Sequence, residues 1–94
     1  MPFPKQEVRL FTKTGIEWLA PNQNGVYGIF RANAWVYVGR GDLRRRLLAH
    51  FNGDNARITS EKPTHYVTEL AVADIAREKQ LILELNPIAN LKVG

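Results

Sequence analysis

The stretch that decides the fold runs from Gly25 to His50, GVYGIFRANAWVYVGRGDLRRRLLAH. It opens with two runs of β-branched and aromatic residues, VYGIF and WVYVG, separated by a short polar segment. Two such runs with a short polar connection are typical of a β-hairpin. We expect a three-residue turn near Arg31, Ala32 and Asn33, with Asn33 in the left-handed conformation that asparagine tolerates well.

The predicted register places Tyr27 opposite Tyr37. Side chains alternate between the two faces of a sheet, so both tyrosines are expected on the same face. That face is predicted to hold Tyr27, Ile29, Trp35, Tyr37 and Gly39, and the other Val26, Gly28, Phe30, Val36 and Val38.

A helix is predicted directly after the hairpin, with Asp42 as its N-cap and LRRRLLAHF as its body. At about 100 degrees per residue, one stripe of this helix is apolar, with Leu43, Leu47 and Phe51 as its members. Arg46 and His50 lie one turn apart along the border of that stripe and face whatever it packs on. Arg44 and Arg45 fall on other faces, where solvent is expected.

The chain on either side of the hairpin and helix gives weaker signals. Residues 1–24 are an N-terminal extension of uncertain structure: Met1–Pro4 is expected to be frayed, and Val8–Trp18 fits either an edge strand or a short helical piece that packs Trp18 inward. The polar segment Asn52–Pro63 predicts a loop with one helical turn. Thr64–Leu70 alternates and predicts a third strand.

A second helix is predicted from about Asp74 to Leu85, because a residue that precedes proline is pushed out of helical geometry. Its apolar arc is formed by Ile75, Leu81, Ile82 and Leu85. Glu78 falls inside this arc, where a carboxylate costs several kcal/mol unless it is paired or coordinated. We therefore expect a cationic partner for Glu78.

Composition narrows the class of protein. With 94 residues and 45% hydrophobic residues, the chain has room for one small globular domain, residues 1–94. A formal net charge of +4 suits a polyanionic partner. There is no cysteine, so a disulfide framework or thiolate zinc site is excluded. No leader-like or membrane-length apolar run is present, and we expect a cytoplasmic protein without membrane association.

Several of these features occur together in a known order. Gly25-Val26-Tyr27, then Tyr37-Val38-Gly39, then Arg46 and His50 on one helix and Glu78 on the next, followed by Pro87 and Asn90, resemble the GIY-YIG nuclease family. The resemblance extends over residues 25–90 and leaves the first 24 residues unexplained. Valine replaces isoleucine in both triplets, and the hairpin is short for the family.

The resemblance implies an α/β (α+β) fold, with a small three-stranded antiparallel sheet flanked by helices. It also implies a metal-dependent endonuclease that hydrolyses DNA phosphodiester bonds by attack of an activated water. Glu78 matches the family's metal-binding glutamate, with Mg²⁺ or Mn²⁺ as the cofactor, and Arg46 matches the arginine that contacts the scissile phosphate.

The remaining site residues also follow from the resemblance. Tyr27 and Tyr37 match the two motif tyrosines, of which one positions or deprotonates the attacking water, and Tyr27 is slightly preferred. His50 matches a catalytic helix histidine. Arg40 and Asn90 are expected to bind substrate or to orient it.

Structural alternatives exist for the same residues. The two tyrosines could be cross-strand packing partners, and Arg46 and Glu78 could be a buried ion pair. The alternative function is a non-catalytic nucleic-acid-binding accessory module on the same fold. If the protein cuts, we expect weak sequence specificity or direction by a partner, in DNA repair or recombination. A homodimer would cut both strands, and a monomer would nick.

Overall fold

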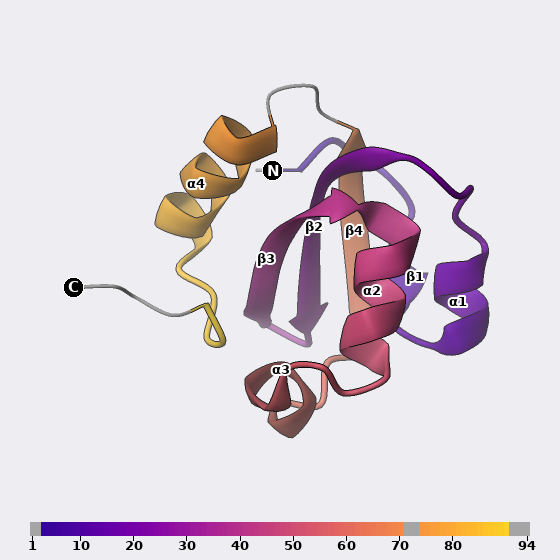
Figure 1. Ribbon diagram of the computed structural model, residues 1–94. Helices are drawn as coiled ribbons and strands as arrows, with labels where there is room; N and C mark the ends of the chain where they lie inside the picture. The colour runs from indigo at the N-terminus through magenta and orange to yellow at the C-terminus, as the bar shows by residue number, and fades with distance from the viewer. Residues whose placement is uncertain (1–2, 71–73, 91–94) are drawn as a thin grey trace.

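A four-stranded antiparallel sheet runs through the middle of the computed structural model, with helices on both sides (Figure 1). The structure describes residues 3–70 and 74–90. Its elements are β1 (Arg9–Leu10), α1 (Lys13–Glu17), β2 (Asn24–Arg31), β3 (Ala34–Asp42), α2 (Leu43–Phe51), α3 (Ala56–Ser60), β4 (His65–Leu70) and α4 (Asp74–Leu85).

The sheet has one strand more than the three that we predicted. The strand order is β1-β4-β2-β3, and β1 pairs with β4 through Arg9 opposite Tyr66 and Leu10 opposite His65. The segment Val8–Trp18, for which an edge strand and a short helical piece were both open, contains one of each, because β1 is followed by α1. A strand of two residues is too short to show an alternation in the sequence. Its pairing depends on β4, which lies more than 50 positions further along the chain.

The hairpin of β2 and β3 forms as predicted, but its register differs. Tyr27 lies opposite Gly39 rather than Tyr37, and Tyr37 lies opposite Ile29. The strands meet at a two-residue turn, in which Ala32 rather than Asn33 has the positive φ of 36°. A β-bulge between Ile29 and Phe30 then shifts the pairing, because β3 has one more residue at that point than β2.

The bulge exchanges the predicted faces of two residues. Val36 lies in the same buried cluster as Tyr27 and Ile29, whereas Trp35 packs with Phe30 on the other face. The predicted faces of Trp35 and Val36 were therefore wrong. A single inserted residue reverses the alternation, and a hydrophobic pattern does not reveal it when both residues are apolar.

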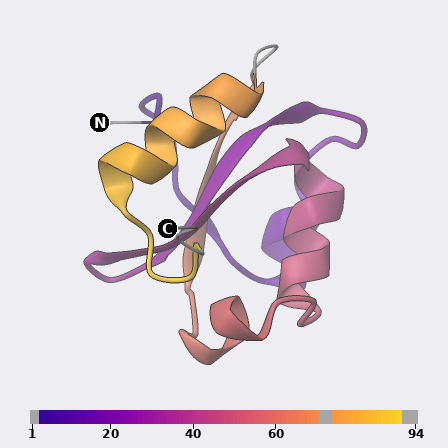
Figure 2. The same cartoon turned by 60° about the vertical axis from the view of Figure 1, so that its left-hand side comes forward.

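Each face of the sheet is covered by a separate hydrophobic cluster. The first cluster lies under α1, α2 and α3 and contains Tyr27, Ile29, Val36, Leu43, Leu47 and Ile58 among its buried members. The second lies under α4 and contains Val26, Val38, Val67 and Leu81. Figure 2 shows α4 and α2 on opposite sides of the sheet. The sheet is thus a central layer with helices on each face.

The segment before β2 contributes to both clusters. Phe3 is 1% exposed and stacks on Trp35 with 5.5 Å between the ring centroids, so the expected fraying was wrong at Phe3. Met1 and Pro2 lie outside the described residues. Trp18 is 62% exposed instead of buried, and the Arg9 guanidinium lies 3.6 Å from the centre of its ring.

The two predicted helices have the predicted bounds. Asp42 caps α2 by accepting a hydrogen bond from the Arg45 amide, and Leu43 and Leu47 are buried while Phe51 is partly exposed. In α4, Leu81 is buried but Ile75 is exposed, so Ile75 does not belong to the packed arc. Within residues 3–70 and 74–90, no helix has the length and apolar character needed to cross a membrane.

Candidate active site

The site is built around Tyr27, which lies in the middle of β2 with its side chain fully buried. Its ring lies across Gly39 of β3, where an added Cβ would come within 2.3 Å of the Tyr27 hydroxyl oxygen. Only glycine leaves room for the ring at this position. The Tyr37 ring lies beside it, tilted by 33° with 6.3 Å between the centroids.

His50 comes to the tyrosine pair from the last turn of α2. The His50 Nε2 atom lies 2.6 Å from the Tyr27 hydroxyl oxygen, and the two rings are 5.6 Å apart. Tyr37 packs edge-on against His50, with 5.1 Å between the ring centroids. Because Leu43 and Leu47 bury the same face of α2, the His50 side chain is brought to the sheet and is only 1% exposed.

Asp54 is a member of the cluster that the sequence did not predict. Its Oδ1 atom lies 2.7 Å from His50 Nδ1, on the side of the imidazole away from Tyr27. Since a carboxylate only accepts hydrogen bonds, Nδ1 carries the proton and Nε2 is left as an acceptor. Tyr27 therefore donates its hydroxyl proton to His50. The available signal was an aspartate four residues after the histidine, just beyond a glycine.

Arg46 lies one helical turn before His50, and its side chain is exposed. Interaction of its guanidinium with the Tyr27 hydroxyl is the main cause that raises the Arg46 pKa. Tyr27 donates to His50 Nε2 and His50 Nδ1 donates to Asp54, so these two hydrogen bonds point in one direction.

Burial disfavours the charged forms of the Tyr27 and Tyr37 phenols and of the His50 imidazole. It is the main cause that raises the pKa of Tyr27, and the nearby Tyr37 and Glu78 raise it further, while Arg46 opposes them. The pKa of Tyr37 is also raised, first by burial and then by Glu78. Burial lowers the pKa of His50, although Asp54 acts in the opposite direction. At neutral pH the site therefore contains a phenol and a neutral imidazole.

Glu78 lies on the first half of α4 and reaches the site beside β3. Its Oε1 atom lies 3.5 Å from Arg40 Nε, so Arg40 is the cationic partner that its placement predicted. About a quarter of the Glu78 side chain is exposed. Its charge raises the pKa of both Tyr27 and Tyr37. Arg46 and Glu78 thus act electrostatically on the tyrosine pair, with opposite effects on the two pKa values.

Asn90 has a different environment from the residues above. Its Oδ1 accepts from the Val38 amide and its Nδ2 donates to the Val38 carbonyl, each over 2.9 Å. The side chain thus pairs with the β3 backbone as a further strand would. Ile88 and Ala89 also bond to β3, through the carbonyls of Trp35 and Val36. Asn90 fixes the segment after α4 to the sheet.

The fold is similar to that of solved nuclease domains. The magnesium-bound structure of the GIY-YIG N-terminal endonuclease domain of UvrC from Thermotoga maritima has a TM-score of 0.69 and 24% sequence identity, covering 81% of this chain and 96% of that chain. An asparagine-to-alanine point mutant of the same domain, bound to its catalytic divalent cation, has a TM-score of 0.70 and 22% identity, covering 82% and 96%. The chain has the GIY-YIG fold.

At the level of sequence, no protein-family model and no curated protein matches the chain. The likeness to the UvrC domain is therefore one of structure, and it covers over four fifths of the chain.

The GIY-YIG fold of this chain offers few protein ligands to a metal. Among the described residues, no three His, Asp or Glu side chains gather as a group that could hold an ion. Glu78 presents a partly exposed carboxylate. One carboxylate completed by waters and substrate oxygens suits Mg²⁺, which dehydrates reluctantly and seldom has an all-protein set of ligands. The residues present therefore fit a magnesium ion better than zinc.

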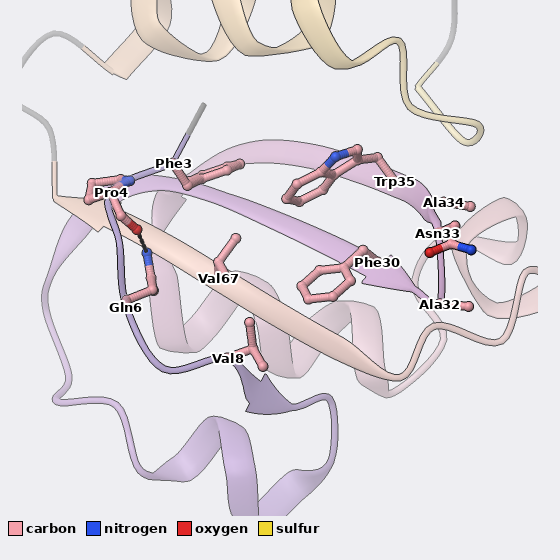
Figure 3. A pocket seen from close by; sticks show the side chains of 10 residues that line it. All are labelled: Phe3, Pro4, Gln6, Val8, Phe30, Ala32, Asn33, Ala34, Trp35 and Val67. Carbon is pink, nitrogen blue, oxygen red and sulfur yellow. Dashed lines mark hydrogen bonds between the residues drawn. The ribbon is translucent and has the colours of Figure 1, made fainter. Parts of the chain in front are cut away.

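A hollow of about 340 Å³ lies on the other face of the sheet (Figure 3). It is lined by members of the second hydrophobic cluster, including Phe3, Phe30, Trp35 and Val67. Its polar lining residues are Gln6 and Asn33, and Gln6 donates to the Pro4 carbonyl. Tyr27 belongs to the first cluster, so this hollow and the tyrosine site are separated by the sheet.

Proposed function

We propose that the protein is a metal-dependent endonuclease, which hydrolyses DNA phosphodiester bonds by attack of an activated water. The observation that carries this proposal is the environment of the Tyr27 hydroxyl. It is held between a basic imidazole nitrogen and a guanidinium, with a carboxylate close by. Tyrosines that served only to pack would not need this set of polar partners.

Glu78 is the residue that would hold a Mg²⁺ or Mn²⁺ ion, and its carboxylate is paired with Arg40 in the free protein. When bound, such an ion supplies charge stabilisation for the phosphate and leaving oxygen and lowers the pKa of water. Asn90 acts on this arrangement from a distance, because it ties the end of α4 to β3. We therefore assign Asn90 to positioning rather than to substrate binding.

Tyr27 and His50 would together accept the proton of the attacking water. Since the pKa of Tyr27 is raised, its phenolate is scarcely populated at neutral pH. Tyr27 can therefore take a proton from water only while its own proton passes to His50 Nε2, 2.6 Å away. This favours Tyr27 over Tyr37 as the residue that contacts the water, because Tyr27 holds that hydrogen bond.

The Arg46 guanidinium has two alternative partners in this scheme, the Tyr27 hydroxyl and the substrate phosphate. In the free protein its exposed side chain interacts with the Tyr27 hydroxyl. A substrate phosphate offers a stronger, doubly hydrogen-bonded partner for a guanidinium. Movement of Arg46 to the phosphate would open the Tyr27 hydroxyl to water and place a positive charge where the transition state gains negative charge.

The first test is cleavage of supercoiled plasmid. We expect nicking with Mg²⁺ and protection by EDTA. Glu78→Gln and Arg46→Gln should each lower the rate by at least about 100-fold, the scale of one charge-stabilising group. Glu17→Gln, on the exposed end of α1, removes one carboxylate elsewhere and should cut like the wild type. Full activity of Glu78→Gln would overturn the metal assignment.

A nucleic-acid-binding module without cleavage is the second candidate, and the Arg40–Glu78 contact favours it. A metal ion at Glu78 must compete with a guanidinium 3.5 Å away. In the enzyme, Arg40→Ala should lower the Mg²⁺ concentration needed for half-maximal cutting or leave it unchanged. Salt-sensitive binding without cutting of duplex, branched or single-stranded DNA or RNA would support the module instead.

The substrate range is also part of the proposal. The site residues above contact phosphate and metal rather than bases, so they give weak sequence specificity. Selection of a site would come from a partner protein or from the structure of the DNA, as in repair or recombination. Cleavage of branched and linear duplexes side by side would separate structure-directed cutting from random nicking.

A further inference from the structure

Asp54 reaches His50 because of how α2 ends. The Asp54 amide donates to the Ala49 carbonyl over 3.2 Å, and the Gly53 amide donates to the His50 carbonyl over 3.1 Å. Gly53 has a φ of 91°, the left-handed conformation that closes a helix with this pair of bonds. The chain therefore turns back on the helix, and the residue after the glycine lies beneath the last turn.

The contact is short and partly shielded from water. Asp54 Oδ1 lies 2.7 Å from Nδ1 of a histidine that is 1% exposed, while the aspartate itself is 37% exposed. Asp54 lies at Nδ1 of the imidazole, Tyr27 lies at Nε2, and the Tyr37 ring packs edge-on against it. The charge of Arg46 also acts on the imidazole and lowers its pKa. Asp54 is the acceptor among them at Nδ1, so it determines which ring nitrogen carries the proton.

We infer that Asp54 is a positioning residue for the proposed hydrolysis, which acts by holding His50 in the Nδ1–H tautomer with Nε2 facing the Tyr27 hydroxyl. The catalytic role of Asp54 rests on the proposed function. The tautomer of His50 rests on the hydrogen-bond geometry alone. A neutral imidazole with the proton on Nε2 would have no lone pair to offer Tyr27.

The step that Asp54 supports conserves atoms and charge. The water oxygen bonds to phosphorus, and the bond from phosphorus to the leaving oxygen breaks with its electron pair on that oxygen. The water proton passes to the Tyr27 oxygen as the Tyr27 proton passes to His50 Nε2. Asp54 stays ionised and stabilises the imidazolium, and bulk water later protonates the leaving oxygen.

The first test is the tautomer of His50, read by NMR from the ¹⁵N shifts of the labelled imidazole in the free protein. The wild type should show a protonated Nδ1 and an unprotonated Nε2. Asp54→Asn keeps the shape of the side chain but can donate its amide to Nδ1, so it should move a large share of the proton to Nε2. Glu17→Gln should leave both shifts unchanged. A wild-type imidazole protonated on Nε2 would overturn the inference.

The second test is the rate of plasmid nicking. Asp54→Asn should lower kcat by at least about tenfold, because it misplaces a proton acceptor worth about 10²- to 10⁴-fold. KM should change little, since Asp54 is not among the phosphate-contacting residues. Asp54→Glu keeps a carboxylate and should recover part of the rate and of the Nδ1–H tautomer. Equal nicking rates for Asp54→Asn and the wild type would exclude a role of Asp54 in catalysis.

The two proposals fail in different ways. A wild type that cuts no nucleic acid would reject the proposed function, and the ¹⁵N shifts would still decide whether Asp54 sets the tautomer. A wild type that cuts, with an Asp54→Asn variant that cuts equally and keeps its tautomer, would reject the role of Asp54 alone.

Discussion

The Tyr27 hydroxyl is the point at which the residues of the site act on one another. It donates to His50, the charge of Arg46 acts on it, and its ring fills the space over Gly39. Burial favours the neutral phenol, so the hydroxyl is held in place without being ionised. The same oxygen is therefore ready to exchange a proton and is restrained from moving.

Substitution of Gly39 tests how tightly the Tyr27 ring is packed against β3. Gly39→Ala should destabilise the protein by about 1–3 kcal/mol, the usual cost of overpacking, because the new methyl would lie 2.3 Å from the Tyr27 oxygen and 2.5 Å from Cζ. Urea unfolding measures the loss. In a double-mutant cycle, Tyr27→Ala should remove most of the cost of Gly39→Ala. Strictly additive effects would show that the strain lies elsewhere.

The lowered pKa of His50 predicts that the stability of the protein depends on pH. The His50 pKa in the folded protein is lowered, so the unfolded chain binds a proton first as the pH falls below about 6.5. The free energy of unfolding should therefore be retained above that pH and decline below it, by at most about 1.4 kcal/mol per pH unit for one proton. Urea unfolding from pH 7.5 to 5.5 measures this.

His50→Asn is the matched comparison for that decline, because asparagine does not titrate. The variant should be less stable at pH 7.5 and should lose less stability on acidification than the wild type. Parallel pH profiles for the two proteins would assign the decline to other groups, such as the carboxylates that titrate at lower pH.

Among the elements, α4 is attached to the sheet at both of its ends. Near its start, Arg77 forms two hydrogen bonds of 2.9 Å to the Glu69 carboxylate of β4. After its end, Asn90 pairs with the β3 backbone at Val38. Leu81 packs between these attachments in the second cluster. Glu78 is thereby held on a helix whose position is fixed from two strands.

Asn90 allows this attachment to be tested. Asn90→Ala leaves the amide and carbonyl of a buried residue, Val38, without this partner, and should cost about 1–3 kcal/mol. The Val38 amide should then exchange with deuterium faster. Asn90→Asp keeps an acceptor for that amide and should protect it better than alanine, although its carboxylate repels the Val38 carbonyl. Unchanged Val38 protection in Asn90→Ala would contradict the attachment.

For the whole molecule, the net charge of +4 predicts binding to nucleic acid that weakens with salt. Arg45 is exposed on α2 beside the site and has its amide, not its guanidinium, bonded to Asp42. Arg45→Gln should weaken binding about equally for all sequences and reduce the slope of log K against log salt by about one phosphate contact. Fluorescence anisotropy at several salt concentrations measures the slope.

The Arg45 variant also separates binding from chemistry. It should raise KM for plasmid nicking and leave kcat nearly unchanged, whereas Arg46→Gln should lower kcat. An unchanged salt slope in Arg45→Gln would place the DNA on another surface. Accumulation of nicked circles before linear DNA would indicate a monomer, and early linear DNA would indicate a dimer that cuts both strands.

Much of the fold could be predicted because its signals are local. Alternation predicted β2, β3 and β4, the Asp42 cap predicted the start of α2, and the Asn86–Pro87 pair predicted the end of α4. Each of these is a preference of a few consecutive residues. The order of the tyrosines, Arg46, His50 and Glu78 along the chain predicted the GIY-YIG fold and proposed the residues of the candidate site.

The tertiary structure decided what depends on distant partners. The bulge that turns Val36 toward Tyr27 results from how β3 meets β2, and the β1 strand exists only where β4 pairs with it. The partner of Glu78 was predicted only as a cation, and packing of α4 on β3 selected Arg40. Asp54 was missed because its contact with His50 requires a left-handed glycine and a buried imidazole, and its residue type indicates neither.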